Sequence, residues 1–336
     1  MKTAIFGLAG SGKTELFQAL TGPRTTLNER AMVKVPEPRL EPLIRYFKPR
    51  KVTHTEIEYL DIRGGGGKSS SLGQRILNEI RAYDCLVAVL DHFSGLADPR
   101  EQLKSIETDL IIADLAVVEK RLEKIEQDKK KAKHLVDAKE EQLLQQVQDR
   151  LEQETPLRAD SELSQAPELK GFCFLSAKPI LYVWNCAEQK LGTGGLPRPG
   201  PGEAHLEISA TLEKELAELE DPEEQQAFLE DLGLEESALN RIIAQTYDLL
   251  GLITFLTGGE KEVRSWPLRS GAKAPEAAGV IHSDIQKGFI RAEVLAWSDF
   301  EDLQDFKKAK EKGVLRLEGK EYLVKDGDII TFRFNV

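Results

Sequence analysis

Gly7-Leu8-Ala9-Gly10-Ser11-Gly12-Lys13-Thr14 is the most informative stretch of this chain. It follows a short apolar strand at residues 3–6 and matches the pattern G-x-x-x-x-G-K-[ST] in full. The glycines are needed because backbone N–H groups must turn inward and touch phosphate oxygens, which a bulky Cβ would obstruct. An amphipathic helix with Leu16, Phe17 and Leu20 follows the loop, as the motif requires. The sequence therefore predicts a nucleoside triphosphate site.

Each residue that the motif specifies has an expected role. Gly7, Gly10, Ser11 and Gly12 are expected to form the cradle, and Lys13 is expected to reach the β and γ phosphates. The hydroxyl of Thr14 is expected to hold Mg²⁺, and the helix that begins near Lys13 points its positive end at the anion. The predicted cofactor is Mg²⁺ with ATP or GTP.

Asp61 is expected to supply an acidic ligand for Mg²⁺. It ends the predicted strand at residues 55–61 and opens the arrangement D-x-x-G with Gly64. A backbone N–H at Gly64 is expected to sense the γ-phosphate. Lys13 and Gly64 are therefore the candidate catalytic residues, and Thr14 and Asp61 are candidate metal ligands.

Bulk properties limit the class of protein. The chain has 336 residues, enough for two or three domains, and no apolar run approaches the roughly 20 residues of a membrane span. The N-terminus enters a strand without a leader, and three isolated cysteines suit a reducing compartment, so we expect a soluble cytoplasmic protein with no membrane contact. The net charge of −11 argues against wholesale coating of nucleic acid, but residues 252–336 hold 14 Lys+Arg and 14 Asp+Glu. That region is therefore expected to approach phosphate more easily than the rest.

The pattern along the chain predicts an α/β nucleotide domain with a mostly parallel sheet, an inserted helical hairpin and a small α+β domain. Strands are expected at residues 3–7, 55–61, 85–91, 179–184 and 205–208, and helices at 211–219 and 235–250. Between residues 101 and 154 apolar residues recur with coiled-coil spacing, at Ile111, Leu115, Val118, Leu122 and Ile125 and again at Val136, Leu144, Val147 and Leu151. The predicted division is 1–100 with 168–251, then 101–167, then 252–336.

The hairpin tip carries Lys129, Lys130, Lys131 and Lys133. A lysine run at such a tip is either a solvated end or an RNA contact. In the C-terminal domain Lys287, Arg291 and Arg333 form either a phosphate-contacting face or a solvated strand face.

Base selection is expected where the strand at 179–184 ends. Guanine-specific relatives of this motif use N-K-x-D there, whereas this chain has Asn185-Cys186-Ala187-Glu188. The longer side chain of Glu188 is poorly placed for guanine, and a site built for one base edge discriminates against the other, so the odds shift toward adenine. Ser209 and Ala210, after the next strand, are the expected position for a backbone contact to the base.

These motifs resemble the Obg-like ATPases, the YchF family of P-loop GTPases, over nearly the whole length. Further segments that carry the resemblance are Val35 to Leu40 with Lys48-Pro49, Ile106 to Leu110, Lys261 to Trp266, Ala278 to Ala292 and Val324 to Val336. The resemblance implies a C-terminal β-grasp TGS domain, ATP binding in preference to GTP, slow hydrolysis, and association with ribosomes or RNA through the hairpin tip and the TGS domain. It also makes Thr25 or Thr26 a candidate Mg²⁺ ligand.

Several positions depart from the family pattern. Gly10 replaces an asparagine that is associated with potassium use, Gly65 replaces a leucine, and the loop from His92 to Pro99 is short. His92 is interpreted as structural, and no residue is then assigned to orient the attacking water. The leading hypothesis is a regulatory ATPase with weak basal turnover that acts as a switch. The alternatives are a nucleotide-gated RNA or ribosome binder with little hydrolysis and a GTP-preferring Obg-like GTPase.

Overall fold

The computed structural model describes residues 1–21, 30–62, 71–96, 98–131, 137–192, 195–219 and 221–335. These residues form two compact units, and each is considered by itself. The first comprises Met1–Val33 with Glu58–Leu249, and the second comprises Lys34–Ile57 with Leu250–Val336. No helix in the described ranges combines the length and the apolar character needed to cross a bilayer.

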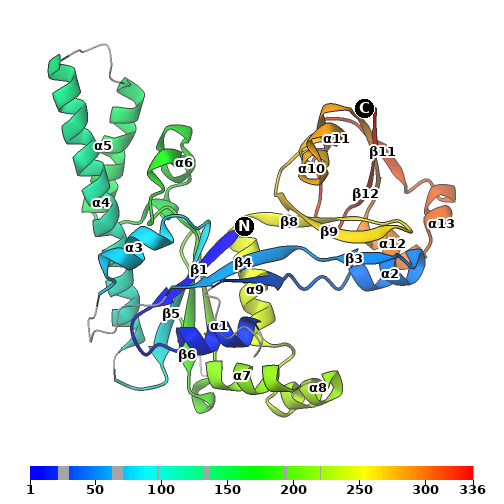
Figure 1. Cartoon of the computed structure of the whole chain (residues 1–336), viewed down its shortest axis with the longest axis horizontal. Helices are drawn as coiled ribbons and strands as arrows, with labels where there is room; N and C mark the ends of the chain where they lie inside the picture. Colours follow the sequence, from blue (N-terminus) through cyan, green and yellow to red (C-terminus); the bar gives the residue numbers. More distant parts are fainter. Residues whose placement is uncertain are drawn as a thin grey trace. The chain divides into compact units, whose positions relative to one another are not determined.

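The first unit is built on a six-stranded sheet in the order β2-β4-β1-β5-β6-β7 (Figure 1). Its strands are β1 (Lys2–Gly7), β2 (Arg30–Lys34), β4 (Glu56–Asp61), β5 (Cys85–His92), β6 (Ile180–Cys186) and β7 (Glu203–Ile208). The β4-β1-β5-β6-β7 pairs are all parallel, which confirms the predicted nucleotide-domain architecture. Strand β6 is buried along its whole length, as expected for a central parallel strand covered on both faces.

Helices cover both faces of this sheet. They are α1 (Lys13–Thr21), α3 (Gln74–Ile80), α4 (Pro99–Lys131), α5 (Ala138–Glu152), α6 (Ser161–Gln165), α7 (Ala210–Glu218), α8 (Pro222–Asp231) and α9 (Ala238–Leu249), with short 3₁₀ segments at Leu157–Ala159, Pro167–Phe172 and Glu188–Lys190. Ile76 and Ile80 of α3 and Ile106 of α4 pack in one buried cluster with alternate residues of β5 and β6. Because a strand alternates its side chains, the remaining residues of those strands face the opposite layer.

The predicted hairpin consists of α4 and α5, which lie side by side (Figure 1). Val118, Ile125, Leu144, Val147 and Leu151 are buried in one cluster, as the apolar spacing predicted. Position Val136 and the tip lysine Lys133 lie outside the described residues. The expected boundary at residue 101 divides α4, because Ile106 and Leu110 belong to the core beneath the sheet and the next turns begin the hairpin cluster.

A buried carboxylate anchors the hairpin helix to the sheet domain. Asp114 of α4 is fully buried, and it accepts hydrogen bonds from Leu175 N at 2.9 Å, Ser176 N at 2.7 Å and Ser176 Oγ at 2.9 Å. Arg81 Nη1 also donates to this carboxylate at 2.8 Å. Four donors satisfy a charge that would otherwise be costly to bury.

The second unit contains a mixed sheet in the order β11-β10-β12-β8-β9-β3. Its elements are α2 (Leu40–Phe47), β3 (Lys51–Thr53), β8 (Leu252–Thr257), β9 (Glu262–Arg269), α10 (Ala274–Ile281), α11 (Ser283–Lys287), β10 (Phe289–Leu295), α12 (Trp297–Leu303), α13 (Phe306–Glu311), β11 (Arg316–Glu318) and β12 (Ile329–Phe334). Strands β8 and β12 are a parallel pair flanked by the antiparallel pairs β8–β9 and β10–β12. This is the β-grasp topology that the family resemblance implied; the narrower TGS assignment stays a prediction.

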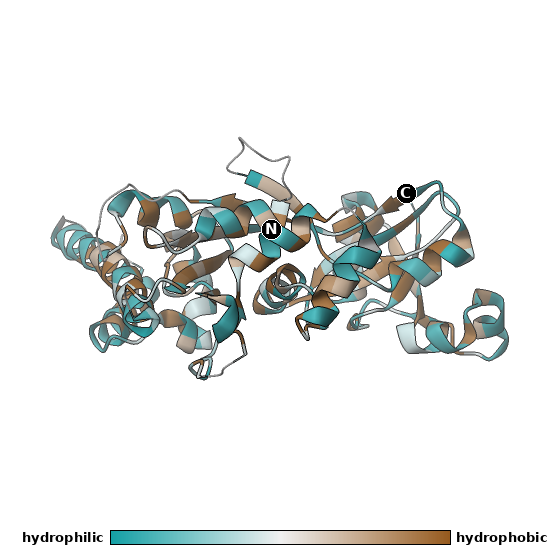
Figure 2. Ribbon diagram, turned by 90° about the horizontal axis from the view of Figure 1, so that it is seen from below, coloured by the Kyte–Doolittle hydropathy of each residue, from teal (hydrophilic) through white to brown (hydrophobic). Residues whose placement is uncertain are grey.

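Both faces of this second sheet are covered. Phe255, Val294 and Ile330 pack with α10 on one face, and their neighbours Leu256, Leu295 and Ile329 pack with α2, α12 and α13 on the other. The alternation follows from the two-residue period of a strand. In Figure 2 the strands of both sheets are mostly brown, whereas the outer faces of the helices are mostly teal.

Residues 34–57 belong to the second unit, which corrects the predicted assignment of 1–100 to the nucleotide domain. Strand β3 pairs in parallel with β9, with Lys51 opposite Glu262 and Thr53 opposite Arg264. The Thr53 hydroxyl donates to Glu262 Oε1 at 2.6 Å, and Thr55 N donates to Ser265 Oγ at 2.8 Å. A three-residue strand has no periodic signature, so its partner more than 200 residues away was not predictable from the local pattern.

Candidate functional site

The phosphate loop joins β1 to α1 in an open conformation with unpaired donors. Gly10 and Gly12 have φ values of 80° and 87°, a region that favours glycine. Within the described residues, no hydrogen bond has the backbone N–H of Gly10, Gly12, Lys13 or Thr14 as its donor. The Ser11 hydroxyl is buried and likewise has no partner in that part of the chain. Clustered N–H groups at a helix N-terminus are the arrangement that accepts a polyphosphate.

Lys13 is the first residue of α1, and it is buried. Its ammonium donates to the carbonyl of Leu8 at 3.0 Å, a contact that the motif alone did not reveal. Burial lowers the pKa of Lys13, and the carboxylates of Asp61 and Glu15 partly oppose that shift. Burial disfavours the charged form of Lys13, and a bound phosphate would favour that form and raise the pKa again.

Thr14 and Asp61 meet as predicted for a magnesium site. The Thr14 hydroxyl donates to Asp61 Oδ2 at 3.3 Å, and Asp61 is buried at the carboxyl end of β4. Oxygen ligands in this small number fit Mg²⁺, which takes the rest of its shell from water and phosphate. The described ranges contain no group of three His, Cys, Asp or Glu side chains able to hold a metal by themselves. Thr25, Gly64 and Gly65 lie outside the described residues.

Asn185 connects the phosphate loop to the segment after β7. Its Nδ2 donates to Ser11 O at 3.0 Å, and its Oδ1 accepts from Ala210 N at 3.0 Å. A Cβ on Gly12 would overlap Nδ2 of Asn185. The assignment of Asn185 to the nucleotide site stays a prediction, and these two bonds show in addition that its amide links the two loops.

Ser209 and Ala210 form the start of α7. The Ser209 hydroxyl accepts from Leu212 N at 3.4 Å, so it caps that helix, and both residues are buried. With the Ala210 N–H committed to Asn185, the two loops are held in one arrangement.

Glu188 begins the 3₁₀ segment after β6 and is exposed. No hydrogen bond or ion pair of its carboxylate occurs within the described ranges, so the group is free to meet a ligand. Cys186 lies on the other face of the strand, in the cluster with Trp184, and so does not occupy the stacking position of a lysine. Burial raises the pKa of its thiol to about 11, which keeps it protonated.

His92 is held by the same cluster. Its Nδ1 lies 3.2 Å from Cys186 Sγ, and its ring meets Trp184 edge-on at a centroid distance of 5.9 Å. These contacts favour the structural interpretation of His92.

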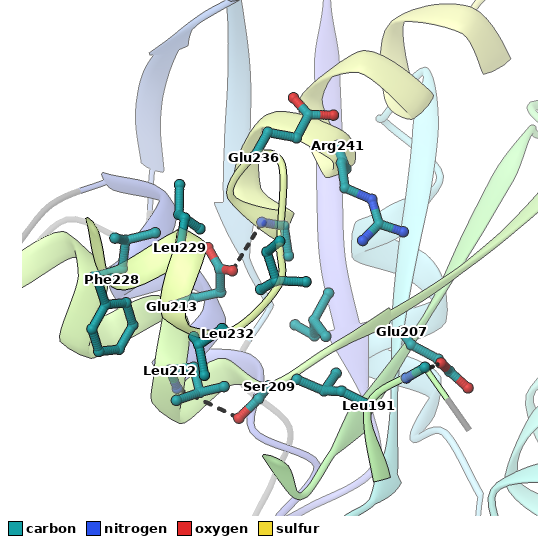
Figure 3. A pocket seen from close by; sticks show the side chains of 15 residues that line it. Leu191, Glu207, Ser209, Leu212, Glu213, Phe228, Leu229, Leu232, Glu236 and Arg241 are labelled. Atoms are coloured by element: carbon teal, nitrogen blue, oxygen red, sulfur yellow. Dashed lines mark hydrogen bonds between the residues drawn. The ribbon is translucent and has the colours of Figure 1, made fainter. Parts of the chain in front are cut away.

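A separate cavity of about 150 Å³ lies beside Ser209 (Figure 3). Apolar residues of α7 and α8, including Leu212, Phe228 and Leu229, line it, and no residue of the phosphate loop does. Glu213 next to it accepts from Ala238 N at 2.8 Å and Leu239 N at 3.3 Å, which caps α9. The cavity is therefore part of the packing of α7, α8 and α9, apart from the phosphate loop.

Two acidic residues of α4, Glu107 and Asp109, connect this helix to other parts of the first unit. In the sequence they stood out only as members of the segment Ile106 to Leu110, which carries the family resemblance. Leu72 N donates to Asp109 at 2.5 Å, just beyond the segment that contains Gly64. Glu107 pairs with buried Arg158 at 2.6 Å and accepts from the Tyr182 hydroxyl. Burial raises the pKa of Glu107 to about 6, against the opposing effect of Arg158. No periodic or spacing signal distinguishes these carboxylates from solvated ones.

The parallel sheet, the phosphate loop and the Thr14–Asp61 pair define a P-loop nucleoside triphosphatase. Comparison with known proteins gives a narrower result. The family model YchF-GTPase_C, described as "Protein of unknown function (DUF933)", matches residues 252–335. The ribosome-binding ATPase YchF of Bacillus subtilis is 39% identical over 367 residues, covering 100% of both chains. The protein of the same name from Haemophilus ducreyi is 39% identical over 363 residues, covering 100% of this chain and 99% of the relative.

Solved structures agree. The Schizosaccharomyces pombe YchF GTPase matches with a TM-score of 0.85 and 29% identity, over 99% of this chain and 97% of that one. A GTP binding protein from Pyrococcus horikoshii matches in fold, with a TM-score of 0.63 and 15% identity over 100% of both chains. The chain belongs to the YchF family, which confirms the resemblance deduced from its motifs.

Proposed function

We propose that this protein is a Mg²⁺-dependent ATPase with slow turnover, whose bound nucleotide controls its association with the ribosome. The observation that carries the proposal is the phosphate loop, where unpaired N–H groups surround a buried lysine beside Thr14 and Asp61. Magnesium, when bound, would neutralise phosphate charge; the chain's own residues hold and orient the polyphosphate. The names of the bacterial relatives, ribosome-binding ATPase, support the partner.

Preference for ATP rests on the segment after β6. Asn185 is engaged with Ser11 and Ala210, and Cys186 is buried away from it. Within the motif Asn185 to Glu188, Glu188 is therefore the exposed polar side chain that could read the base. A carboxylate on this longer side chain is poorly placed to hold guanine as an aspartate does. The solved relatives are named for GTP, so the preference needs its own measurement.

Isothermal titration of ATP and GTP, each with Mg²⁺, tests the ligand. We expect tighter binding of ATP in the wild type, and a smaller difference between the two nucleotides in Glu188→Ala. Equal or tighter binding of GTP would contradict the preference, and the absence of heat with either nucleotide would contradict the site itself.

A nucleotide-gated binder without useful hydrolysis is the second candidate. The names of the relatives, ribosome-binding ATPase and GTPase, favour the first candidate over this one. Phosphate release measured with and without ribosomes separates the two. Slow release that ribosomes accelerate supports the ATPase, and no release in either condition supports the binder.

A further inference from the structure

The two units carry opposite net charge. Residues 34–57 and 250–336 together contain 20 Lys+Arg and 17 Asp+Glu, a surplus of three positive charges, although the whole chain has a net charge of −11. The first unit therefore has a net charge of −14. The positive surplus of the second unit comes from residues 34–57, which the predicted domain division had assigned to the nucleotide domain.

The positive charge is concentrated in two short segments of the second unit. Residues 45–51 and 307–312 hold eight basic residues and one acidic residue, Glu311. All eight basic side chains are exposed: Arg45, Lys48, Arg50, Lys51, Lys307, Lys308, Lys310 and Lys312. Lys51 pairs with Glu262 at 3.3 Å; the other seven form no ion pair within the described ranges.

Aromatic contacts bring the two segments together. The Phe306 ring of α13 lies 5.4 Å from Tyr46 and 5.1 Å from Phe47 of α2, measured between centroids. Buried Ala309 fixes the inner face of α13, so its lysines point outward. Tyr46, Phe47 and Phe306 are only partly buried, so aromatic surface remains between the cations. We call these two segments and their rings the α2–α13 surface.

Lys48 has a backbone conformation that favours glycine. It ends α2 with φ 46° and ψ 56°, and its N–H donates to Ile44 O at 2.9 Å. Glycine is the usual residue at such a left-handed helix end, because any Cβ is strained there. Glu154, Cys173 and Gln304 also have a positive φ, so the value of Lys48 is as a test site: glycine there removes the cation while it relieves backbone strain.

Nearby acidic groups limit the surface without neutralising it. Asp305 is engaged by Lys307 N at 2.6 Å and Lys308 N at 3.3 Å, where it caps α13. Asp299, Glu301 and Asp302 lie on α12, which borders the surface. The acidic residues of α12 therefore mark one edge of the positive surface.

We propose that the α2–α13 surface binds RNA, with its lysines and arginines on phosphates and its rings against exposed bases. This inference rests on the proposed ribosome association and names the surface responsible for it. Unpaired cations beside partly exposed rings suit single-stranded RNA better than an acidic protein, because every base presents a face for stacking.

Two double variants of the full chain test the surface: Lys308→Ala with Lys310→Ala, and Lys48→Gly with Arg50→Ala. Lys273→Ala with Lys320→Ala is the matched control, because these exposed lysines lie at the start of α10 and just after β11, outside the α2–α13 surface. Binding is measured by sedimentation with purified ribosomes and by anisotropy with protein-free ribosomal RNA, over a range of salt concentrations.

Each test pair is expected to weaken RNA binding about 15- to 30-fold at about 0.15 M salt and to reduce the salt slope by about 1.4 to 1.8, the effect of two lost phosphate contacts. The control pair should bind like the wild type. The single variant Lys48→Gly should bind about fivefold more weakly while its melting temperature stays level or rises, a combination that general damage to the fold does not produce.

Equal binding by test pairs and wild type would overturn the surface while leaving ribosome association intact. Loss of ribosome binding in the test pairs, with no wild-type binding to protein-free RNA, would overturn RNA as the partner in favour of a ribosomal protein. If the wild type binds neither ribosomes nor RNA, the proposed association itself is wrong.

Discussion

Replacement of Gly12 by alanine tests how the phosphate loop is held. Gly12 and Gly10 both have positive φ, so alanine at either position costs about 1 to 2 kcal/mol of backbone strain. A Cβ at Gly10 meets nothing within 4 Å, whereas a Cβ at Gly12 overlaps Nδ2 of Asn185. Gly10→Ala is therefore a control with the same strain and no collision.

The extra cost at Gly12 comes from Asn185. If the new methyl group displaces that amide, the bonds to Ser11 O and Ala210 N are lost, at about 0.5 to 1.5 kcal/mol each. Gly12→Ala should then destabilise the first unit by roughly 2 to 5 kcal/mol, against roughly 1 to 2 kcal/mol for Gly10→Ala.

A double-mutant cycle isolates the collision. In an Asn185→Ala background the overlapping atom is absent, so Gly12→Ala should cost no more than Gly10→Ala, with a coupling of about 1 to 3 kcal/mol. Urea unfolding followed by circular dichroism measures the stabilities, and isothermal titration of Mg-ATP measures the cradle. Equal costs for the two glycine variants, with a coupling below about 0.5 kcal/mol, would refute this account.

Three further predictions concern buried ionisable groups. Calorimetric titration of Mg-ATP in buffers of different ionisation enthalpy should show proton uptake on binding, and this uptake should grow at alkaline pH. The reason is that burial lowers the pKa of Lys13 in the ligand-free protein and a bound phosphate would raise it. Lys13→Ala should bind Mg-ATP weakly and show no such uptake. The pKa of Glu107, raised from 4.5 to about 6, means that the folded state holds this proton more tightly, so its contribution to stability is present below pH 4.5 and falls by about 2 kcal/mol as pH rises through about 6. Glu107→Gln should remove that component from the pH profile of urea unfolding, and an unchanged profile would contradict it. Asp114→Asn should lower the free energy of unfolding by roughly 2 to 4 kcal/mol, because its new NH₂ group faces donors of Ser176; a change below about 0.5 kcal/mol would show that the four bonds are not needed.

Local patterns predicted the parts of the fold that local physics determines. The phosphate loop, the strands at β1, β5 and β6, and the buried stripe of the hairpin have short-range signatures in glycine spacing and apolar period. Thr14 and Asp61 were predicted together because the chemistry of Mg²⁺ needs both, and they lie within hydrogen-bond distance.

Long-range partnerships were not predictable. Strand β3 is too short to show a period, and its pairing with β9 spans most of the chain. The motif places Asn185 in the nucleotide site, but a sequence does not show that Ser11 O and Ala210 N converge on its amide. The α2–α13 surface was missed for the same reason, since its two halves lie about 260 residues apart in the sequence.

The pairing of β3 with β9 also has a consequence for synthesis of the chain. Thr53 leaves the translating machinery long before its partner Arg264 has been made. At about 5 to 20 residues per second the wait is roughly 10 to 40 s, during which α2 and β3 have no sheet to join. The nascent first unit can mature early, whereas completion of the second must await the last strand, β12. Until then α2 has no sheet against which to bury Leu40 and Leu43, and a chaperone could bind these apolar side chains.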